Sequence, residues 1–310
     1  MPPPVQGGGG TTVPTALVAL SPTNAQDAAA GATLTGLETS NNLSTQVDGA
    51  SALSTTIPQR LPQTHVLGRI IRQQIDQLTQ HLQTSPAVPV AAALTPHNCD
   101  KGGKVDVASN GPNSVTETFA ACSPAADVTI DGTITIDNVS VDPGVSFNGS
   151  AALDLVIKQT GFPDVSVTGS NVSLLETINV NVVAFTLSGP ELLIATTGNT
   201  ERLGNFNLTS SFDTNAGTET DDISFGYAST KLGGAVNVST DTPFVTDLSM
   251  NRQFPHTGVL SLSGTGGSKI RVTINGDETL ATPQLKIEVD ADGNGTFETS
   301  VDKNWADLVV

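Results

Sequence analysis

Charged side chains are scarce in this sequence, and basic ones are the scarcest. Only 14% of the 310 residues are charged, with 13 Lys and Arg against 30 Asp and Glu, which gives a formal net charge of −17. Such an acidic protein repels phosphate backbones and anionic lipid surfaces. We therefore expect neither nucleic-acid binding nor polybasic docking to membranes. The excess of carboxylates favours divalent cations as partners.

Aromatic residues and histidines are also few, with one Trp, one Tyr, ten Phe and four His. The histidines show no zinc-binding spacing such as HExxH, and the sequence contains no GxSxG elbow, Walker A loop or dinucleotide fingerprint. Polysaccharide sites usually need aromatic platforms, so a hydrolase built on two carboxylates is only a third hypothesis. We therefore expect no enzymatic activity and assign no catalytic residue.

Long apolar runs and cysteines are nearly missing as well. No stretch of 18 apolar residues occurs, which predicts no transmembrane segment. The two cysteines, Cys99 and Cys122, bracket two strand-like runs joined by a Gly/Asn/Pro turn, a geometry that would bring them together. Two interpretations stand: a disulfide, which an oxidising compartment would favour, or two buried free thiols.

Thr, Ser, Asn, Gly, Val and Ala dominate instead, a composition typical of β-rich proteins outside the cytoplasm (cell surface, periplasm or secreted). From Gly103 onward, apolar residues alternate with Thr, Ser and Asn, which predicts antiparallel strands with one buried face. Asp-Gly and Asn-Gly pairs, as in VTIDGTITI (128–136), indicate hairpin turns. We expect a mainly β domain over residues 97–310, as a large curved antiparallel sheet, a sandwich or a partly open barrel.

Two segments precede this domain. Residues 1–62 form a low-complexity arm, which we expect to be extended; its run TTVPTALVALS could add a strand to a sheet edge, its own or a neighbour's. Residues 63–85 predict one amphipathic helix that covers a face or an end of the sheet; the alternative is a helix for a membrane surface or a partner. Its apolar stripe consists of Leu67, Ile70, Ile71, Ile75, Leu78 and Leu82.

The stretch DADGNGTFE, residues 290–298, is the closest approach to a chemical motif. Oxygen-bearing side chains alternate as in a calcium loop, with a glycine at the sixth position, but the bidentate Glu of an EF-hand is absent and the flanks read as strands. The loop is therefore either a weak Ca²⁺ site or a plain acidic turn. The residues that would hold the ion are Asp290, Asp292, Asn294, Thr296 and Glu298.

A second acidic segment, DTNAGTETDD at residues 213–222, matches no motif, and we expect a solvated loop there. Before it, the run INVNVVAFTLSG (178–189) alternates and then slips at Val183 and Ala184, which predicts a β-bulge within one strand.

Four features in order resemble a loose group of uncharacterised bacterial cell-envelope β-rich proteins, many of them lipoproteins. They are QGGGG near the start, CDKGGKV after a helix, a second Cys before VTIDGTITI, and the closing DxDGxGTxE loop. The resemblance implies an extracytoplasmic location and a β-rich fold, but no activity. The relatives usually carry a lipidated Cys before the glycines, and this sequence has none there.

Two functional hypotheses follow. The first is a non-enzymatic, exported structural or interaction protein of the cell surface that self-assembles as a homo-oligomer through strand addition by its N-terminal arm. The alternative is a periplasmic or outer-membrane carrier that binds an apolar ligand inside the curved sheet. In the carrier, the ligand would contact Leu67, Ile71, Ile75, Phe185 and Leu187.

Overall fold

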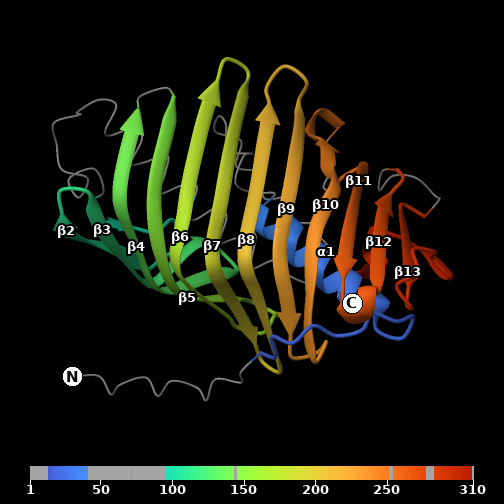
Figure 1. Cartoon of the computed structure of the whole chain (residues 1–310). Coiled ribbons are helices and arrows are strands. Elements are labelled where there is room, and N and C mark those ends of the chain that lie inside the picture. Colours follow the sequence, from blue (N-terminus) through green and yellow to red (C-terminus); the bar gives the residue numbers. More distant parts are fainter. Residues whose placement is uncertain are drawn as a thin grey trace.

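The described residues of the chain form one antiparallel sheet of fourteen strands that does not close into a barrel (Figure 1). The structure is a computed structural model, and it describes residues 13–40, 71, 95–142, 145–250, 254–276 and 283–308. Each strand pairs with the strands before and after it in the sequence. The strands are β1 (His97–Asn98), β2 (Lys104–Gly111), β3 (Ser114–Ala125), β4 (Val128–Asp142), β5 (Ser146–Gln159), β6 (Val165–Asn179), β7 (Val182–Thr196), β8 (Asn199–Asp213), β9 (Thr218–Ser229), β10 (Gly234–Asp247), β11 (Thr257–Ser263), β12 (Lys269–Ile274), β13 (Leu285–Asp290) and β14 (Thr299–Lys303).

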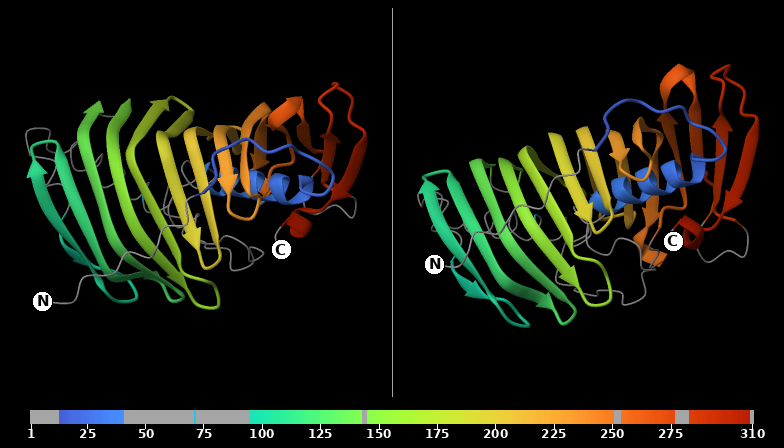
Figure 2. Two further views of the ribbon diagram at one scale, coloured as in Figure 1. Left: turned by 60° about the horizontal axis from the view of Figure 1, so that its bottom comes forward. Right: turned by 90° about the horizontal axis from the view of Figure 1, so that it is seen from below.

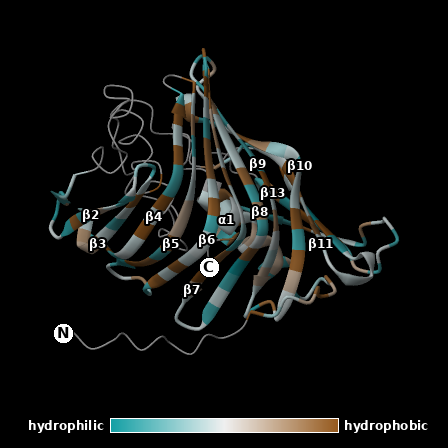
Figure 3. Ribbon diagram, turned by 60° about the vertical axis from the view of Figure 1, so that its left-hand side comes forward, coloured by the Kyte–Doolittle hydropathy of each residue, from teal (hydrophilic) through white to brown (hydrophobic). Residues whose placement is uncertain are grey.

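The core lies on one face of this sheet, which we call the inner face. Along β5, for example, Phe147, Leu153, Leu155 and Ile157 are at most 3% exposed, while Asp154 between them is exposed. Figure 3 shows the resulting bands of hydrophobic and hydrophilic residues along the strands. The mainly β antiparallel fold is thus confirmed, and of the three architectures expected the open, curved sheet is the one observed.

The helix α1 (Ala25–Ser40) lies in the trough of the curved sheet, across its C-terminal strands (Figure 2). It contacts β8 and β9 on one side, β12 and β13 on the other, and the short C-terminal helix α4 (Trp305–Leu308). Its small residues allow a close approach, since a Cβ on Gly31 would lie 2.3 Å from the Tyr227 hydroxyl oxygen. A buried hydrogen bond of 2.8 Å from Thr35 Oγ1 to Glu201 Oε2 joins α1 to β8.

This helix corrects the expectation of an extended arm over residues 1–62. Alanines and threonines dominate α1, and its side chains are buried on several sides, among them Ala28, Ala29, Ala32 and Thr33 at 0%. A helix of small residues without one apolar stripe has the same composition as a low-complexity linker, so the composition alone could not distinguish the two.

The segment before α1 joins the sheet. Residues 16–20, here called the strap, form a parallel bridge between Leu17 and Ala235 at the start of β10. Val18 N donates to Ala235 O at 3.0 Å, and Ala235 N donates to Ala16 O at 2.8 Å. The run TTVPTALVALS therefore does pair with a strand of its own sheet, although over one bridge only.

The predicted helix over residues 63–85 lies almost wholly outside the described residues. Ile71 is the exception: it is helical, 1% exposed and part of the hydrophobic core. The other five residues of the predicted stripe, and the bounds of that helix, stay predictions. Among the described helices, none is long and apolar enough to cross a membrane.

The predicted bulge at Val183 and Ala184 is wrong. The chain turns at Val180 and Asn181, and Asn179 pairs with Val182 across a tight hairpin between β6 and β7. Val180 is 98% exposed at the tip of this hairpin. A valine at a turn tip runs against the usual turn chemistry, so the sequence carried no signal for a turn at this point.

Candidate functional site

The acidic loop joins β13 to β14 and is anchored by Asp290, the last residue of β13. The Asp290 side chain is only 1% exposed, although the residues after it are exposed. Its Oδ1 accepts hydrogen bonds from the backbone N–H groups of Gly293 (2.8 Å) and Asn294 (3.1 Å), and its Oδ2 accepts one from Gly295 (2.9 Å). The carboxylate thus organises the whole turn from its base.

The next polar side chains continue this pattern along the loop. Asp292 Oδ1 accepts from the N–H of Asn294 at 3.1 Å, and Asn294 Oδ1 accepts from the N–H of Thr296 at 2.7 Å. Gly293 adopts φ 74°, and the β11–β12 turn packs against it so closely that a Cβ would lie 2.6 Å from Gly266 O. Both the conformation and the contact require glycine at this position.

Three carboxylates converge on one side of the loop. Glu298 Oε2 accepts from the N–H of Ala291 at 3.0 Å, which folds its side chain back over the turn. One oxygen from each of Asp290, Asp292 and Glu298 lies within 4.8 Å of the others, an arrangement that could hold a metal ion. Of the five predicted ligands, these three are brought together, whereas the side-chain oxygen of Asn294 is engaged by Thr296.

The strand next to the loop supplies a cation rather than another ligand. The Arg271 guanidinium lies 4.3 Å from the centre of the Phe297 ring and bonds to Glu288 on β13 at 2.7 Å. Partial burial opposes ionisation of Glu288, but hydrogen bonds from Lys286 and Arg271 lower its pKa overall. These contacts hold Phe297, and with it the C-terminal arm of the loop, against the sheet.

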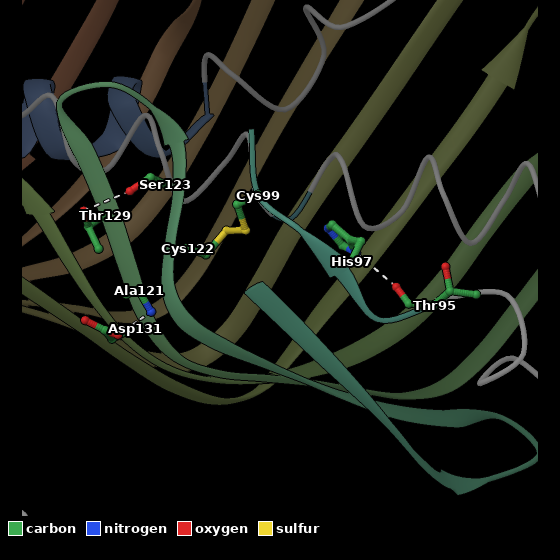
Figure 4. The surroundings of a disulfide bond; sticks show 8 residues. All are labelled: Thr95, His97, Cys99, Ala121, Cys122, Ser123, Thr129 and Asp131. Atoms are coloured by element: carbon green, nitrogen blue, oxygen red, sulfur yellow. Dashed lines mark hydrogen bonds between the residues drawn. A yellow bond between two sulfur atoms is a disulfide. The ribbon is translucent and has the colours of Figure 1, made fainter. Parts of the chain in front are cut away.

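Cys99 and Cys122 form a disulfide, so the first of the two interpretations of the cysteines is confirmed (Figure 4). Cys122 lies on β3, and Cys99 follows the two-residue strand β1. Backbone hydrogen bonds from Lys101 N to Ser123 O and from Ser123 N to Gly102 O flank the bridge. The disulfide therefore ties the start of the sheet to its third strand.

The second acidic segment is not the solvated loop that we expected. Asp213 caps the β8–β9 turn through the N–H groups of Asn215 and Ala216, but Glu219 and Asp221 lie on β9 and are 1% and 0% exposed. Ser210 Oγ donates to Glu219 Oε1 at 2.9 Å. Alternation along the strand turns both carboxylates to the inner face, a consequence of register that the local composition hides.

A shallow cavity of about 350 Å³ lies on the outer face where the strap meets β8, β9 and β10. Gly204 and Gly226, paired across β8 and β9, add no side chains to its lining. Thr15 and Leu17 form one wall and Arg202 another. No residue pattern in the sequence pointed to this place, because it depends on the position of the strap.

Comparisons with known proteins find no counterpart: no family model, curated protein or solved structure matches the chain. The protein is therefore classified by its architecture alone. The described residues form an open fourteen-stranded antiparallel sheet with a helix in its trough and an acidic loop between its last two strands. The resemblance to cell-envelope proteins stays a prediction.

Proposed function

We propose that the protein is a non-enzymatic structural or interaction protein of the cell surface that associates with copies of itself through its N-terminal segment. The observation that carries the proposal is the strap, which holds its place in the sheet by backbone hydrogen bonds to Ala235 and Thr265. Main-chain pairing of this kind is how strand addition between chains gains affinity. An exported location is supported by the disulfide, which persists in oxidising compartments.

The site beside β10 where the strap lies accommodates the backbone of one additional chain segment. β11 ends at Ser263, which pairs with Asn237, and the strap takes the position beside Ala235 where a longer β11 would continue. A Cβ on Gly234 would lie 2.2 Å from Val18 Cγ1, and a Cβ on Gly264 would lie 2.2 Å from Val18 O. The same contacts are available to a strap from a second copy, which is the condition for exchange between chains.

Both ends of the sheet also offer backbone groups. In the described part of the chain, β14 pairs with β13 alone, and β1 covers only Lys104 and Val105 of β2. Edges of this kind are templates for pairing with another chain. Asp302 and Lys303 on β14 restrict that pairing to partners that accommodate their charges.

Removal of the strap tests the proposal. Because α1 is part of the core, we would delete residues 1–20 and keep α1; deletion of residues 1–12 is the matched control, since it leaves the strap intact. Multi-angle light scattering should show oligomers for the full chain and the control, and monomers for the strapless protein. If the full chain and the strapless protein are both monomers, exchange of the strap is refuted.

We also propose that the acidic loop binds Ca²⁺ weakly. The loop offers carboxylate oxygens from Asp290, Asp292 and Glu298, which are the hard ligands that this ion prefers. With few ligands and much exposure, the dissociation constant should be about 10⁻⁴ to 10⁻³ M, as in extracellular modules.

Calorimetric titration with CaCl₂ tests the loop. The wild type and Asp302→Ala, which changes an exposed carboxylate on β14, should release the same heat, and Asp292→Ala should release none. Identical traces for the wild type and Asp292→Ala would remove the site, and Mg²⁺ in place of Ca²⁺ tests the identity of the ion.

The alternative, a carrier of an apolar ligand, draws support from the apolar inner face of the open sheet. Phe185 and Leu187, which would contact the ligand, are 0% exposed within the packed core, and Ile71 is 1% exposed. Side chains so closely packed favour a core over a lumen, which places the carrier second. Native mass spectrometry of the purified protein decides the point, because a carrier should retain lipid.

A further inference from the structure

Glu117 is a buried acid without a partner among the described residues. It lies on the inner face of β3, 1% exposed, and neither of its carboxylate oxygens accepts a hydrogen bond from the part of the chain that the structure describes. Buried polar groups are almost always hydrogen-bonded, so this carboxyl is an exception that needs an explanation.

The surroundings of Glu117 are apolar on every described side. Val107 on β2 and Ile134 on β4 lie directly opposite it, and Val115 and Phe119 flank it on β3. The charged residues of the neighbouring strands alternate to the outer face, where Lys104 pairs with Asp106 and Lys158 with Asp131. No titratable group of β2 or β4 therefore faces Glu117; the outer-facing charged residues of these strands are Lys104, Asp106, Asp131, Asp137 and Asp142.

Burial alone raises the pKa of Glu117 from 4.5 to about 8. The side chain is thus a neutral acid when the inner face is closed, and it would lose its proton readily when exposed to water. Desolvation without a compensating charge is the physical cause.

The ladder beside Glu117 is an interrupted one. The β3–β4 register shifts twice, between Phe119 and Cys122 and again between Cys122 and Ala125, and Ala121 adopts φ 49°. The N–H of Ala121 donates to the Asp131 side chain at 2.8 Å. By contrast, β6 and β7 pair from Asn179 to Ser166 with no register shift.

On the outer side of this ladder, β1, β2 and β3 form one unit. The Cys99–Cys122 disulfide joins the end of β1 to β3, and β2 lies between them. If the β3–β4 ladder opens, these three strands must therefore move together. The ladder is the seam between this unit and the remaining eleven strands.

We propose that the β3–β4 ladder is a pH-operated seam: ionisation of the Glu117 carboxyl opens it and releases β1–β3 as one flap. The opening exposes the edge of β4, a strand of 15 residues, as a template for another strand. The proposal does not depend on self-association of the strap.

The direction and range of the response follow from linkage. Below pH 4.5 the carboxyl is protonated in both the closed and the open seam, so opening does not depend on pH. Between pH 4.5 and about 8 only the open state loses the proton, so the opening constant rises about tenfold per pH unit. Above about pH 8 both states are ionised and the constant levels off, roughly three orders of magnitude above its acid value.

Hydrogen–deuterium exchange from pH 5 to pH 8 tests the seam, with protection factors corrected for the intrinsic exchange rate. In the wild type, amides of β3 and β4 should lose about tenfold protection per pH unit, while amides of β6 and β7 keep theirs. Glu117→Gln, and Glu117→Met as a second uncharged variant, should abolish this dependence. Asp131→Asn is the control for the other carboxyl at the seam and should preserve it.

Asp131 is a fair control because it titrates in another range. Its own slight burial opposes ionisation, but the hydrogen bonds from Ala121 and Lys158 lower its pKa below 3.8 overall. The stability that it contributes is present above its unfolded pKa and is lost only as the pH falls through still lower values, outside the window tested. The proposal is overturned if the protection of the β3 and β4 amides falls with pH equally in the wild type and Glu117→Gln. It is also overturned if the protection of the β6 and β7 amides falls by the same factor.

Discussion

Three asparagines bend the strands that carry them. Asn138, Asn171 and Asn205 adopt φ of 56°, 54° and 47° on β4, β6 and β8, and each side chain is exposed. The residue after each one is buried in the core: Val139, Val172 and Phe206. Asparagine tolerates the left-handed conformation better than other residues with a Cβ, so it can bend a strand without a glycine.

The same three positions mark a repeat that is not evident from the sequence alone. The local sequences are DNVSV, SNVSL and GNFNL, and the asparagines are 33 and 34 residues apart. Each copy sits on the first strand of a long hairpin, β4–β5, β6–β7 and β8–β9. The copies share an asparagine, one core residue and alternation, which is too little to stand out from a sequence rich in Asn, Ser and Val.

Substitution at Asn171 tests this role. Valine fits a strand but not positive φ, so Asn171→Val should lower the free energy of unfolding by about 1–2 kcal/mol, whereas Asn171→Gly should stay within about 0.5 kcal/mol of wild type. Urea denaturation followed by circular dichroism measures both. Ser173→Val, an exposed position two residues along β6, is the matched control and should be neutral. Equal stability of Asn171→Val and wild type would show that the bend needs no asparagine.

Carboxylates of one type serve different purposes according to their place. The sequence predicted the acidic loop from its spacing, and three of the five residues do converge. What spacing did not reveal is that Asp290 is buried and anchors the turn, or that Glu117 stands alone in the core. Both facts depend on which face of a strand a residue occupies, and that is settled by pairing register over long distances.

At the scale of elements, the N-terminal segment fits its place because glycines and alanines leave room. Gly234 and Gly264 admit the strap, and Gly31 and Gly36 let α1 approach Tyr227 and Phe225. The prediction that the arm adds a strand to a sheet edge stays a prediction, because the described residues show a single bridge, between Leu17 and Ala235, and no strand. The helix that follows was missed, since tertiary packing rather than an apolar stripe stabilises it.

Gly234→Val should displace the strap. Its new side chain would collide with Val18 at a position where the backbone itself is not strained. The strap would therefore detach from β10, and the free energy of unfolding would fall by about 1–3 kcal/mol. Limited proteolysis should then cut within residues 13–24 at protease concentrations that leave the wild type intact.

Gly226→Ala is the matched control for this variant, because the nearest atom to its new Cβ, Gly204 O, is 3.5 Å away. It should behave as wild type. A Gly234→Val protein that resists proteolysis in residues 13–24 would mean that the strap is held by other contacts.

At the scale of the whole molecule, alternation and turn signals were enough to predict a mainly β, antiparallel and curved fold. They were not enough to choose between a sandwich and a single open sheet, because both bury one face of each strand. The turn at Val180 and Asn181 shows the same limit, since a hairpin without Gly or Pro reads as a continuous strand. Strand number and sheet closure depend on contacts that no local pattern encodes.

The sequential strand order has a consequence for how the chain matures. Each hairpin can pair with the one before it as the polypeptide emerges from the ribosome, because strands that are neighbours in the sheet are also neighbours in the sequence. The helix α1 is made before every strand that it contacts. It can dock on β8 and β9 once these have formed, but its contacts with β12, β13 and α4 form only near the end of synthesis. Until then a nascent chain carries α1 only partly covered, with side chains that are buried in the finished fold open to chaperones.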